Sequence, residues 1–269
     1  MARTPTRSAH IVTLTTDFGP GEYVGAMRGA ILSIDPHASV YDLDHLVRPQ
    51  DIRHGAYVLL AATPFYPFAA HVGVVDPGVG TDRRGIVVVC KGGLLIGPDN
   101  GLLIPAAKRL GLSEVRTITN KRLMATRVSD TFHGRDVFAP VAAHLVNGVK
   151  PSEVGPKLAK FVDLDFGEPR KVKGGYEGDV ITHDRFGNIV TNIPRELGER
   201  TWSLGDRLGV IVSGYEVTVP LVRTYGEVPR GDFLATFSSS GFFEIARREG
   251  NAAAQLNAAP GSPVVVMRS

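Results

Sequence analysis

HIVTLTTDFG (10–19) is a continuous β-rich run, and YVGAMRGAILSID (23–35) follows it with apolar residues at helical spacing. A strand followed by a helix in this way is the unit from which α/β domains are built. Further strand-like and helical runs follow it in the first half: SVYDLDH (39–45), QDIRHGAYVLLAATPFY (50–66), AAHVGVVDPGVG (69–80), GIVVVC (85–90), GLLIGPDN (93–100), GLLIPAAKRLG (101–111), EVRTITN (114–120) and GRDVFAPVAAHLVNG (134–148).

This alternation predicts an α/β fold, with an N-terminal, mainly parallel sheet that carries helices on both faces. Asp99 or Asn100 is placed to cap the helix that we expect over 101–111. Ligands of such sheets bind beyond the carboxyl ends of the strands. Asp17 and Asp76 both stand at such ends, so the chemistry is expected there.

The alternating strand and helix pattern ends at Gly148. The Pro-containing, irregular segment that follows (151–171) is typical of a linker. We expect a flexible N-terminus over 1–9, an α/β domain over 10–150, a linker over 151–172 and a second domain over 173–269. Short β runs predict a C-terminal antiparallel β-barrel, interrupted by a single helix over GFFEIARREGNAAAQL (241–256). The runs are GGYEGDVITHD (174–184), GNIVTNI (187–193), RLGVIVSGYEVTVPLV (207–222), DFLATFS (232–238) and SPVVVMRS (262–269).

Composition excludes several classes of protein. Of the 269 residues, 43% are apolar and 21% charged, which is ordinary for a globular chain. No window approaches the roughly 20 apolar residues that span a bilayer, and no apolar segment follows the basic N-terminus as in a signal peptide. The formal charge of +3 is spread along the chain, which disfavours a nucleic-acid partner. The single cysteine, Cys90, lies in an apolar run and is expected to be buried, so we expect a cytoplasmic protein.

Two clusters of the first half carry carboxylates at strand ends. Asp17, in TTDFG, can accept two hydrogen bonds from a ribose diol; the alternative is an aspartate that orders a turn. Asp76, in VVDPGVGTDRR, is followed at once by Arg83 and Arg84. An aspartate beside an arginine stays ionised, and the pair can hold a water or hydroxide. The alternative is a surface ion pair after a tight turn.

The third cluster is SDTFHGRDVFAP, in which His133 precedes a glycine and a predicted helix start. A histidine there can carry a proton near neutral pH. The alternative is a histidine that caps the helix through a hydrogen bond. The adjacent Arg135 and Asp136 are expected to form a structural pair.

The fourth cluster is HDRFGNIVTNI in the second half. Phe186 offers a face for stacking, Asn188 an amide that suits an adenine edge, and Asp184 an anion for an ammonium group. The alternative is a hairpin turn. Ser239 and Ser240, in SSSG, add hydroxyl and backbone donors that suit a carboxylate.

Common cofactor and metal motifs are absent from the sequence. It contains no HExxH or paired CxxC spacing, and no GxGxxG, GxxxxGK[ST] or GxSxG. We therefore expect no metal and no cofactor. A metal-dependent phosphohydrolase remains an alternative, and it would be built on Asp17, Asp76, Asp99 and His133.

Taken together, the clusters resemble the S-adenosylmethionine hydroxide adenosyltransferase family, whose members hydrolyse S-adenosylmethionine and are related to fluorinating and chlorinating enzymes. The resemblance runs from about residue 10 to the C-terminus. It rests on ordered motifs: TTDFG (15–19), YVGAMRG (23–29), PQDIRHGA (49–56), VVDPGVGT (74–81) with the following arginines, GPDNGLL (97–103), FHGRDVFAP (132–140), FGNIVTNI (186–193), SSSGFFEIA (238–246) and EGNAA (249–253).

The resemblance implies roles for ten residues. A hydrolytic triad would fall on Asp76, Arg83 and His133, with Asp17 on the ribose hydroxyls. The remaining substrate contacts would come from Gln50 near the nucleoside, Phe186 and Asn188 at the adenine, and Asp184, Ser239 and Ser240 at the methionine end.

The resemblance also implies an assembly and a reaction. Members form trimers, with each active site between the N-terminal domain of one subunit and the C-terminal domain of the next. The expected reaction is attack of water or hydroxide on C5′ of S-adenosylmethionine, giving adenosine and L-methionine. The alternatives are a halide-dependent transferase that forms 5′-halo-adenosine, the phosphohydrolase above, and a module that binds adenosine or S-adenosylmethionine without turnover.

Overall fold

The computed structural model describes residues 10–269, so the N-terminus predicted to be flexible (1–9) lies outside the described residues. The chain divides into two compact units, the first ending at Asp165 and the second running from Phe166 to Ser269. Each unit has its own sheet and its own hydrophobic core. They are described one at a time.

The first unit is built on a six-stranded sheet with the order β2-β1-β3-β5-β4-β6. The β1–β2, β1–β3 and β3–β5 pairs are parallel, whereas β4 is antiparallel to both β5 and β6. The sheet is therefore mixed, because the two-residue turn between β4 and β5 is too short for a parallel crossover. The strands are β1 (Ile11–Thr16), β2 (Ser39–Asp44), β3 (Ala70–Val74), β4 (Gly85–Cys90), β5 (Gly93–Pro98) and β6 (Leu112–Thr117).

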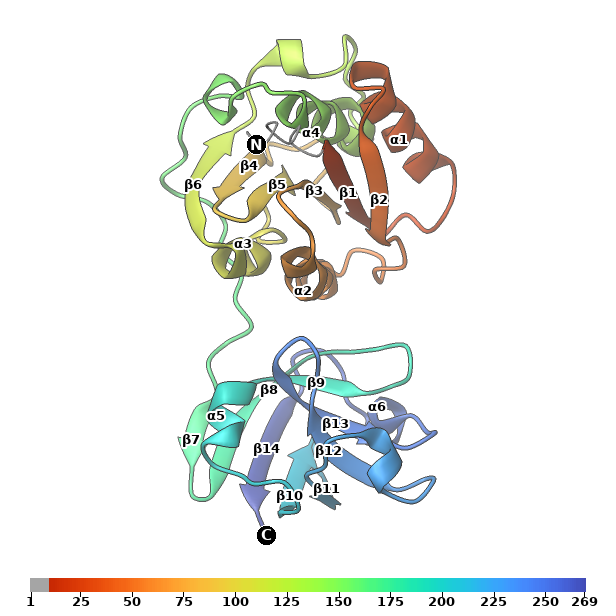
Figure 1. The fold of residues 1–269 in the computed structure, drawn as a ribbon, viewed down its shortest axis with the longest axis vertical. Helices are drawn as coiled ribbons and strands as arrows, with labels where there is room; N and C mark the ends of the chain where they lie inside the picture. The colour runs from red at the N-terminus through yellow and green to blue at the C-terminus, as the bar shows by residue number, and fades with distance from the viewer. Residues whose placement is uncertain (1–9) are drawn as a thin grey trace, which may run out of the picture. The chain divides into compact units, whose positions relative to one another are not determined.

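Helices cover both faces of this sheet, as predicted. In Figure 1, α1 and α4 lie on one face and α2 and α3 on the other. The central strand β3 is buried along its whole length, which explains why its sequence is apolar without alternation. The helices are α1 (Glu22–Ile34), α2 (Ile52–Ala62), α3 (Ile104–Leu110) and α4 (Ala139–Val146).

The predicted cap of the third helix is wrong. Helix α3 begins at Ile104, and neither Asp99 nor Asn100 caps it. Asn100 instead accepts a hydrogen bond from the Leu102 backbone N–H at 3.1 Å, which orders a turn ahead of the helix. Gly101, at φ 93°, lets the chain make that turn.

The second unit is an antiparallel, barrel-like sheet with the order β11-β10-β14-β8-β9-β13-β12, and β7 pairs with β8. A bridge between Leu221 and Ala235 brings the two ends of this order together. This agrees with the predicted barrel. The strands are β7 (Arg170–Val172), β8 (Gly175–His183), β9 (Ile189–Pro194), β10 (Arg207–Val212), β11 (Tyr215–Pro220), β12 (Phe233–Phe237), β13 (Phe242–Arg247) and β14 (Pro263–Arg268), with helices α5 (Arg195–Glu199) and α6 (Ala252–Gln255).

The single helix predicted over 241–256 is wrong. Its first part is strand β13, which pairs with β12 and β9, and its last part is the short helix α6. The side chains of Phe243 and Ile245 both point into the barrel core. Burial between two strands therefore outweighs the helix propensity of EIARRE (244–249).

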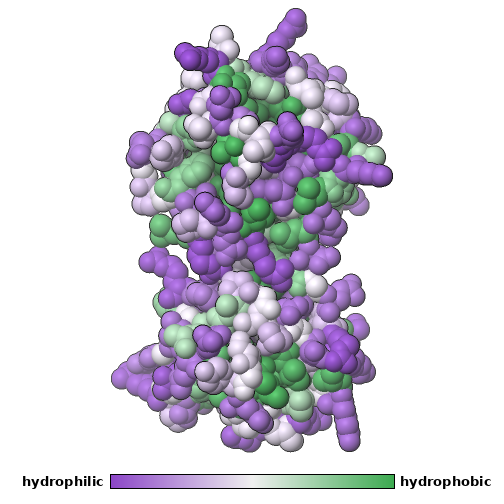
Figure 2. Space-filling view, turned by 180° about the vertical axis from the view of Figure 1, so that it is seen from behind, coloured by the Kyte–Doolittle hydropathy of each residue, from purple (hydrophilic) through white to green (hydrophobic). Residues whose placement is uncertain are grey.

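The surface is polar for the most part. On the face shown in Figure 2, hydrophobic residues occupy small areas between polar ones. Of the helices within residues 10–269, none has the length and apolar content to cross a membrane. Cys90 is buried as predicted and is a free thiol, and burial raises its pKa to about 12.

Candidate active site

The carboxyl ends of β1 and β3 place two aspartates at one edge of the first unit. The strands are parallel neighbours, and Thr16 pairs with Val74. Asp17 follows β1 directly and Asp76 follows β3 by two residues. The prediction that both stand at carboxyl strand ends is therefore confirmed.

Asp76, Arg83 and His133 contact one another directly. Arg83 donates from Nε to Asp76 Oδ1 at 3.1 Å and from Nη2 to Asp76 Oδ2 at 2.5 Å, which is a bidentate pair. The same Nη2 lies 2.9 Å from His133 Nδ1. The Asp76 and Arg83 side chains are only 5% and 9% exposed, so this is no surface ion pair.

The contact with Arg83 fixes the tautomer of His133. A guanidinium has only donors, so Nδ1 must be the unprotonated, accepting nitrogen. The proton of the neutral ring is then on Nε2, which makes no hydrogen bond to another described residue. His133 does not cap the following turn with its side chain, so the capping alternative is not what the geometry shows.

Burial shifts the pKa of both titratable members. Burial, with the neighbouring Arg83 cation, lowers the pKa of His133 from its usual 6.5. Burial raises the pKa of Asp76 from its usual 3.8, although Arg83 opposes this. A neutral imidazole is therefore maintained beside an arginine at neutral pH.

Packing holds the three side chains in place. The Arg83 guanidinium lies over the fully buried Phe138 ring, 5.4 Å from its centroid, and the His133 ring meets the same ring edge-on. A Cβ on Gly80 would come within 2.4 Å of the Asp130 carbonyl oxygen, so only glycine lets the loop after β3 approach the loop before His133. His133 itself leads into a π-helical turn over 134–138, a feature often found at functional sites.

Asp17 and Gln50 are also brought together. The Gln50 backbone N–H donates to Asp17 Oδ2 at 2.8 Å, across 33 residues of sequence. Gln50 has φ 63°, in the left-handed region that a non-glycine residue rarely occupies. The loop after β1 is held a second time by the Gly19 N–H, which donates to the His45 carbonyl at 2.8 Å.

An aromatic cluster links the Asp17 loop to the His133 loop. Phe18, Tyr23 and Phe132 meet in pairs, with ring centroids between 5.2 and 5.9 Å apart. Since Phe18 follows Asp17 and Phe132 precedes His133, the cluster sets the spacing of the two polar groups. Arg135 and Asp136 form the structural pair that was expected, with Nε to Oδ1 at 2.6 Å.

The fourth cluster forms the β8–β9 loop of the second unit. Asp184 Oδ1 accepts from the backbone N–H groups of Phe186 and Asn188, both at 2.9 Å. Asp184 Oδ2 accepts from the Asn188 side-chain amide at 2.9 Å. Asp184 thus organises a hairpin, which was the alternative reading, and it holds Asn188 while doing so. Phe186 stays 77% exposed.

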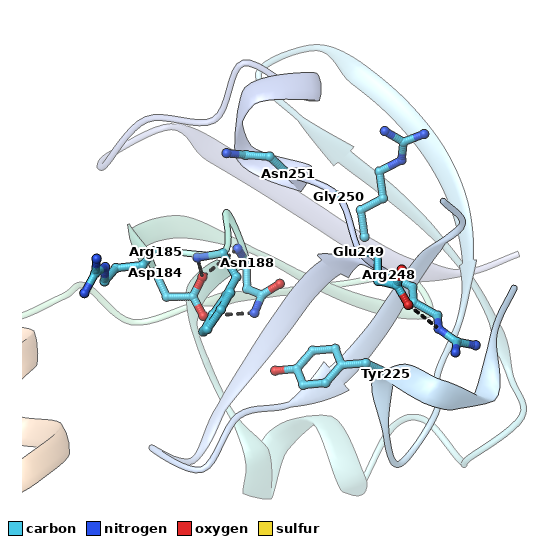
Figure 3. Close-up of a pocket in the computed structure, with 10 residues that line it drawn as sticks. Asp184, Arg185, Asn188, Tyr225, Arg248, Glu249, Gly250 and Asn251 are labelled. Atoms are coloured by element: carbon cyan, nitrogen blue, oxygen red, sulfur yellow. Dashed lines mark hydrogen bonds and ion pairs between the residues drawn. The ribbon is translucent and has the colours of Figure 1, made fainter. Parts of the chain in front are cut away.

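This loop lines a cavity of about 770 Å³, shown in Figure 3. Its size is within the range of small-molecule sites. A Cβ on Gly187 would collide with Asn251 at 2.2 Å, so the loop lies tightly against the start of α6. The lining is Asp184, Arg185, Phe186, Asn188, Tyr225, Arg247, Arg248, Glu249, Gly250 and Asn251.

Several lining residues were not predicted. Tyr225 comes from the short turn Tyr225–Glu227, which carries no motif in the sequence. Asn251 lies in EGNAA, a quoted motif, but the expectation of one long helix hid its position at the N-cap of α6.

Ser239 and Ser240 are not among the residues that line this cavity. They lie in the turn between β12 and β13, with Ser239 exposed and Ser240 buried. Ser240 Oγ lies 2.8 Å from Ser238 Oγ. The Arg195 guanidinium donates to the Phe237 and Ser238 carbonyls and so braces the turn.

A metal-binding arrangement is not seen in the described part of the chain. No group of three or more His, Cys, Asp or Glu side chains within 10–269 is placed to hold a metal ion. Asp99, one of the four residues of the metal-dependent alternative, is instead buried against Arg84 at 2.5 Å and accepts from the Val162 N–H.

Known proteins resemble both units. The models of the SAM hydroxide adenosyltransferase N-terminal and C-terminal domains match residues 12–155 and 178–265. An (R)-S-adenosyl-L-methionine hydrolase of Methanocaldococcus jannaschii is 40% identical over 258 residues, 92% of each chain. A fluorinase of an Actinoplanes species is 27% identical over 297 residues, 98% of this chain and all of its own.

A solved structure agrees with the sequence matches. An uncharacterized conserved protein of Thermotoga maritima superposes with a TM-score of 0.90 at 36% identity, covering 96% of this chain and all of its own. The two domain models together match well over half of the sequence, in the expected order. The chain therefore belongs to the SAM hydroxide adenosyltransferase family.

Proposed function

We propose that the protein hydrolyses (R)-S-adenosyl-L-methionine to adenosine and L-methionine, by attack of water or hydroxide on C5′. The observation that carries the proposal is the direct contact of Asp76, Arg83 and His133 in a chain of this family. Relatives at 37–40% identity are named for this hydrolysis, whereas the fluorinases are more distant, at 26–27% identity.

The donors that remain free would hold the nucleophile. Arg83 has five N–H donors, and Nε and Nη2 use three of them on Asp76 and His133. Nη1, with two N–H groups, makes no hydrogen bond to another described residue, and neither does His133 Nε2–H. Such unused donors suit an oxygen with negative charge. In this proposal Arg83 and His133 stabilise hydroxide, and Asp76 fixes the guanidinium.

In the reaction, a new bond forms between this oxygen and C5′ as the C5′–S bond breaks. The electron pair of that bond goes to sulfur, and neutral methionine thioether leaves without needing a general acid. When water is the nucleophile, one proton is released, and Asp76, whose pKa burial raises, is the base proposed to take it. Opposite charges on hydroxide and sulfonium cancel in the transition state, which a dry site favours.

The rest of the substrate would be held by residues of the first unit and of the second unit. Asp17 is assigned to the ribose hydroxyls, with Gln50 beside it, and Phe186 and Asn188 to the adenine. Asp184, Ser239 and Ser240 are assigned to the methionine end; their support is the family motif, since Asp184 already accepts three hydrogen bonds within its loop.

The assembly proposed is a homotrimer, in which the first unit of one subunit and the second unit of its neighbour form each site. The division of the assigned residues between two units motivates it. Sedimentation measures the mass, and mixing tests the shared site. Asp76→Ala mixed with a Phe186→Ala/Asn188→Ala variant regains activity at low substrate concentration if subunits share sites. No regain is expected if each chain builds its own site.

No cofactor is assigned, because water is the nucleophile and the leaving group is neutral. EDTA should leave the rate unchanged; a loss that a divalent ion restores would instead support the metal-dependent phosphohydrolase. A cytoplasmic location is proposed because Cys90 is a buried free thiol, as is usual in a reducing compartment.

The decisive experiment incubates the pure protein with each sulfonium epimer of S-adenosylmethionine and resolves the products by chromatography. Equal amounts of adenosine and methionine from the R epimer are expected, without added halide. Asp76→Ala should reduce adenosine release by at least about 10²-fold. Adenosine release by Asp76→Ala at the wild-type rate, or a strict requirement for halide, would contradict the proposed function.

A further inference from the structure

Glu244 is a buried carboxyl that the proposed reaction does not use. It lies in the middle of β13 and is 4% exposed. Its neighbours Phe243 and Ile245 point into the barrel core. Because side chains alternate along a strand, Glu244 faces the outside of the barrel. Something must therefore cover it there.

The cover is the segment that follows β11. The Val222 N–H donates to the Ala235 carbonyl at 2.9 Å, which fastens the start of this segment to β12. Its far end is fastened by Val228, which packs on Leu234 and Ala246 outside the barrel. The Tyr225–Glu227 turn lies between these two anchors.

Tyr225 connects the buried carboxyl to the cavity. Its hydroxyl donates to Glu244 Oε1 at 2.6 Å. Tyr225 lines the cavity and is 44% exposed. Among the described residues, this hydroxyl is the one hydrogen-bond donor to the Glu244 carboxyl, so the buried carboxyl relies on Tyr225. Figure 3 shows the hydroxyl end of Tyr225 directed toward the side of the cavity where Asp184 and Asn188 lie.

The charged group that acts on Glu244 is Asp184, which lines the same cavity. Burial raises the pKa of Glu244 from its usual 4.5, the Tyr225 hydrogen bond opposes this, and the Asp184 carboxylate adds to it. Asp184 and Glu244 therefore each hold a side chain that lines the cavity: Asp184 holds the Asn188 amide and Glu244 holds the Tyr225 hydroxyl.

We propose that Glu244 is a positioning residue for nucleobase binding, which fixes the Tyr225 ring as one wall of the cavity by accepting a hydrogen bond from its hydroxyl. The inference rests on the proposed function in that the cavity receives the adenine. A tyrosine that is free to turn must be ordered when the base binds, and that ordering lowers affinity. The Glu244 acceptor orders the ring in advance.

The test measures adenosine affinity by calorimetry, and KM and kcat for S-adenosylmethionine, on the full-length protein. Tyr225→Phe keeps the ring and removes the hydroxyl, and Glu244→Ala removes the acceptor. Each is expected to raise adenosine Kd and KM about tenfold with kcat within twofold, because one hydrogen bond no longer holds the wall. Glu244→Gln keeps a carbonyl acceptor and should recover most of the loss.

A double variant separates this role from a general loss of structure. Tyr225→Phe and Glu244→Ala together should cost no more than either alone, because they remove the same bond. Tyr215→Phe is the matched control, since Tyr215 is a half-exposed tyrosine of the same unit outside the cavity lining. It should leave Kd and KM unchanged. If Glu244→Ala does not fold, the conservative Tyr225→Phe still reports the bond.

Unchanged Kd and KM in Tyr225→Phe, or additive losses in the double variant, would overturn the inference and leave the proposed function standing. The opposite case is also distinct. If the wild type releases no adenosine from S-adenosylmethionine but binds adenosine in a Tyr225-dependent way, the proposed function fails and the positioning role stands.

Discussion

The two units use their polar side chains in different ways. In the first, side chains from two separate segments bond to one another: Asp76 and Arg83 from the loop between β3 and β4, and His133 from the segment before α4. In the second, Asp184 bonds within its own loop and leaves an aromatic face, Phe186, exposed beside a cavity. One region fixes charge and proton positions, and the other fixes shape.

This difference indicates how the work of an enzyme is divided. Stabilising a developing charge requires donors that are already oriented and shielded from water. Holding a flat base requires walls of fixed geometry, with few polar contacts. Changes in the first region should therefore reduce kcat, and changes in the second should raise KM. Variants that mix these two effects would break the comparison.

The largest effect is expected from Arg83→Lys. An ammonium keeps the charge but cannot donate in a fork to Asp76 while also reaching His133 Nδ1. We expect kcat to fall by roughly 10²–10³-fold, as when an oriented donor is lost, with KM little changed. Steady-state kinetics measure it. Arg84→Lys is the control, because Arg84 pairs with Asp99 instead; an equal loss there would refute the special role of Arg83.

Much of this fold is predictable from local pattern. The run 10–19 and the segments that follow it alternate with the periods of strands and helices, so the α/β unit is visible in the sequence. The helix predicted over 241–256 was wrong because its first part is decided by non-local pairing with β12 and β9, which no local pattern records. The cap at Asp99 failed because that carboxylate pairs with Arg84, the residue just before β4.

The site divides in the same way. Strand ends and loop motifs marked Asp17, Asp76 and His133, but only the folded chain shows that Nδ1 of His133 accepts from Arg83. The left-handed backbone of Gln50 gives no sign in the sequence, because glycine is the usual residue there. Tyr225 lines the cavity because of the path that the folded chain takes, and no sequence motif marks it.

The next effect concerns pH and follows from the tautomer of His133. Protonated His133 cannot accept from Arg83, so the active form carries a neutral ring. Because burial and Arg83 lower the His133 pKa below 6.5, the neutral form persists as pH falls through 6.5. We expect the acid limb of kcat/KM to have its midpoint below 6.5, and kcat/KM to fall by about tenfold per pH unit below the shifted pKa. A midpoint at or above 6.5 would contradict the geometry.

A matched variant assigns that acid limb. His133→Asn retains a small polar group but has no imidazole to titrate, so its lower activity should lack the limb that is seen in the wild type. Persistence of the same limb in His133→Asn would assign it to another group, with Asp76 the first to consider.

A smaller effect is expected from Phe186→Ala in the second region. Stacking of an aromatic side chain on a base contributes about 1–3 kcal/mol, so KM and the adenosine Kd should rise by at least about fivefold. Phe186 is 77% exposed and packs on no core, so kcat and the melting temperature should stay near those of the wild type. Phe65→Ala is the control, since Phe65 is 75% exposed in the first unit. A fall in kcat in Phe186→Ala would contradict the assignment of kcat effects to the first unit and KM effects to the second.

The smallest effect is expected from Asp184→Asn, and it decides between two roles of that carboxyl. An asparagine keeps one oxygen for the backbone N–H groups of Phe186 and Asn188, but it cannot accept with both groups, so the Asn188 amide is released. The loss of one hydrogen bond should raise the adenosine Kd about threefold, and KM for S-adenosylmethionine by the same factor. If Asp184 instead binds the substrate ammonium, KM must rise far more than the adenosine Kd, because adenosine has no ammonium group. Equal factors would assign Asp184 to the loop and the nucleobase, and unequal ones to the methionine end.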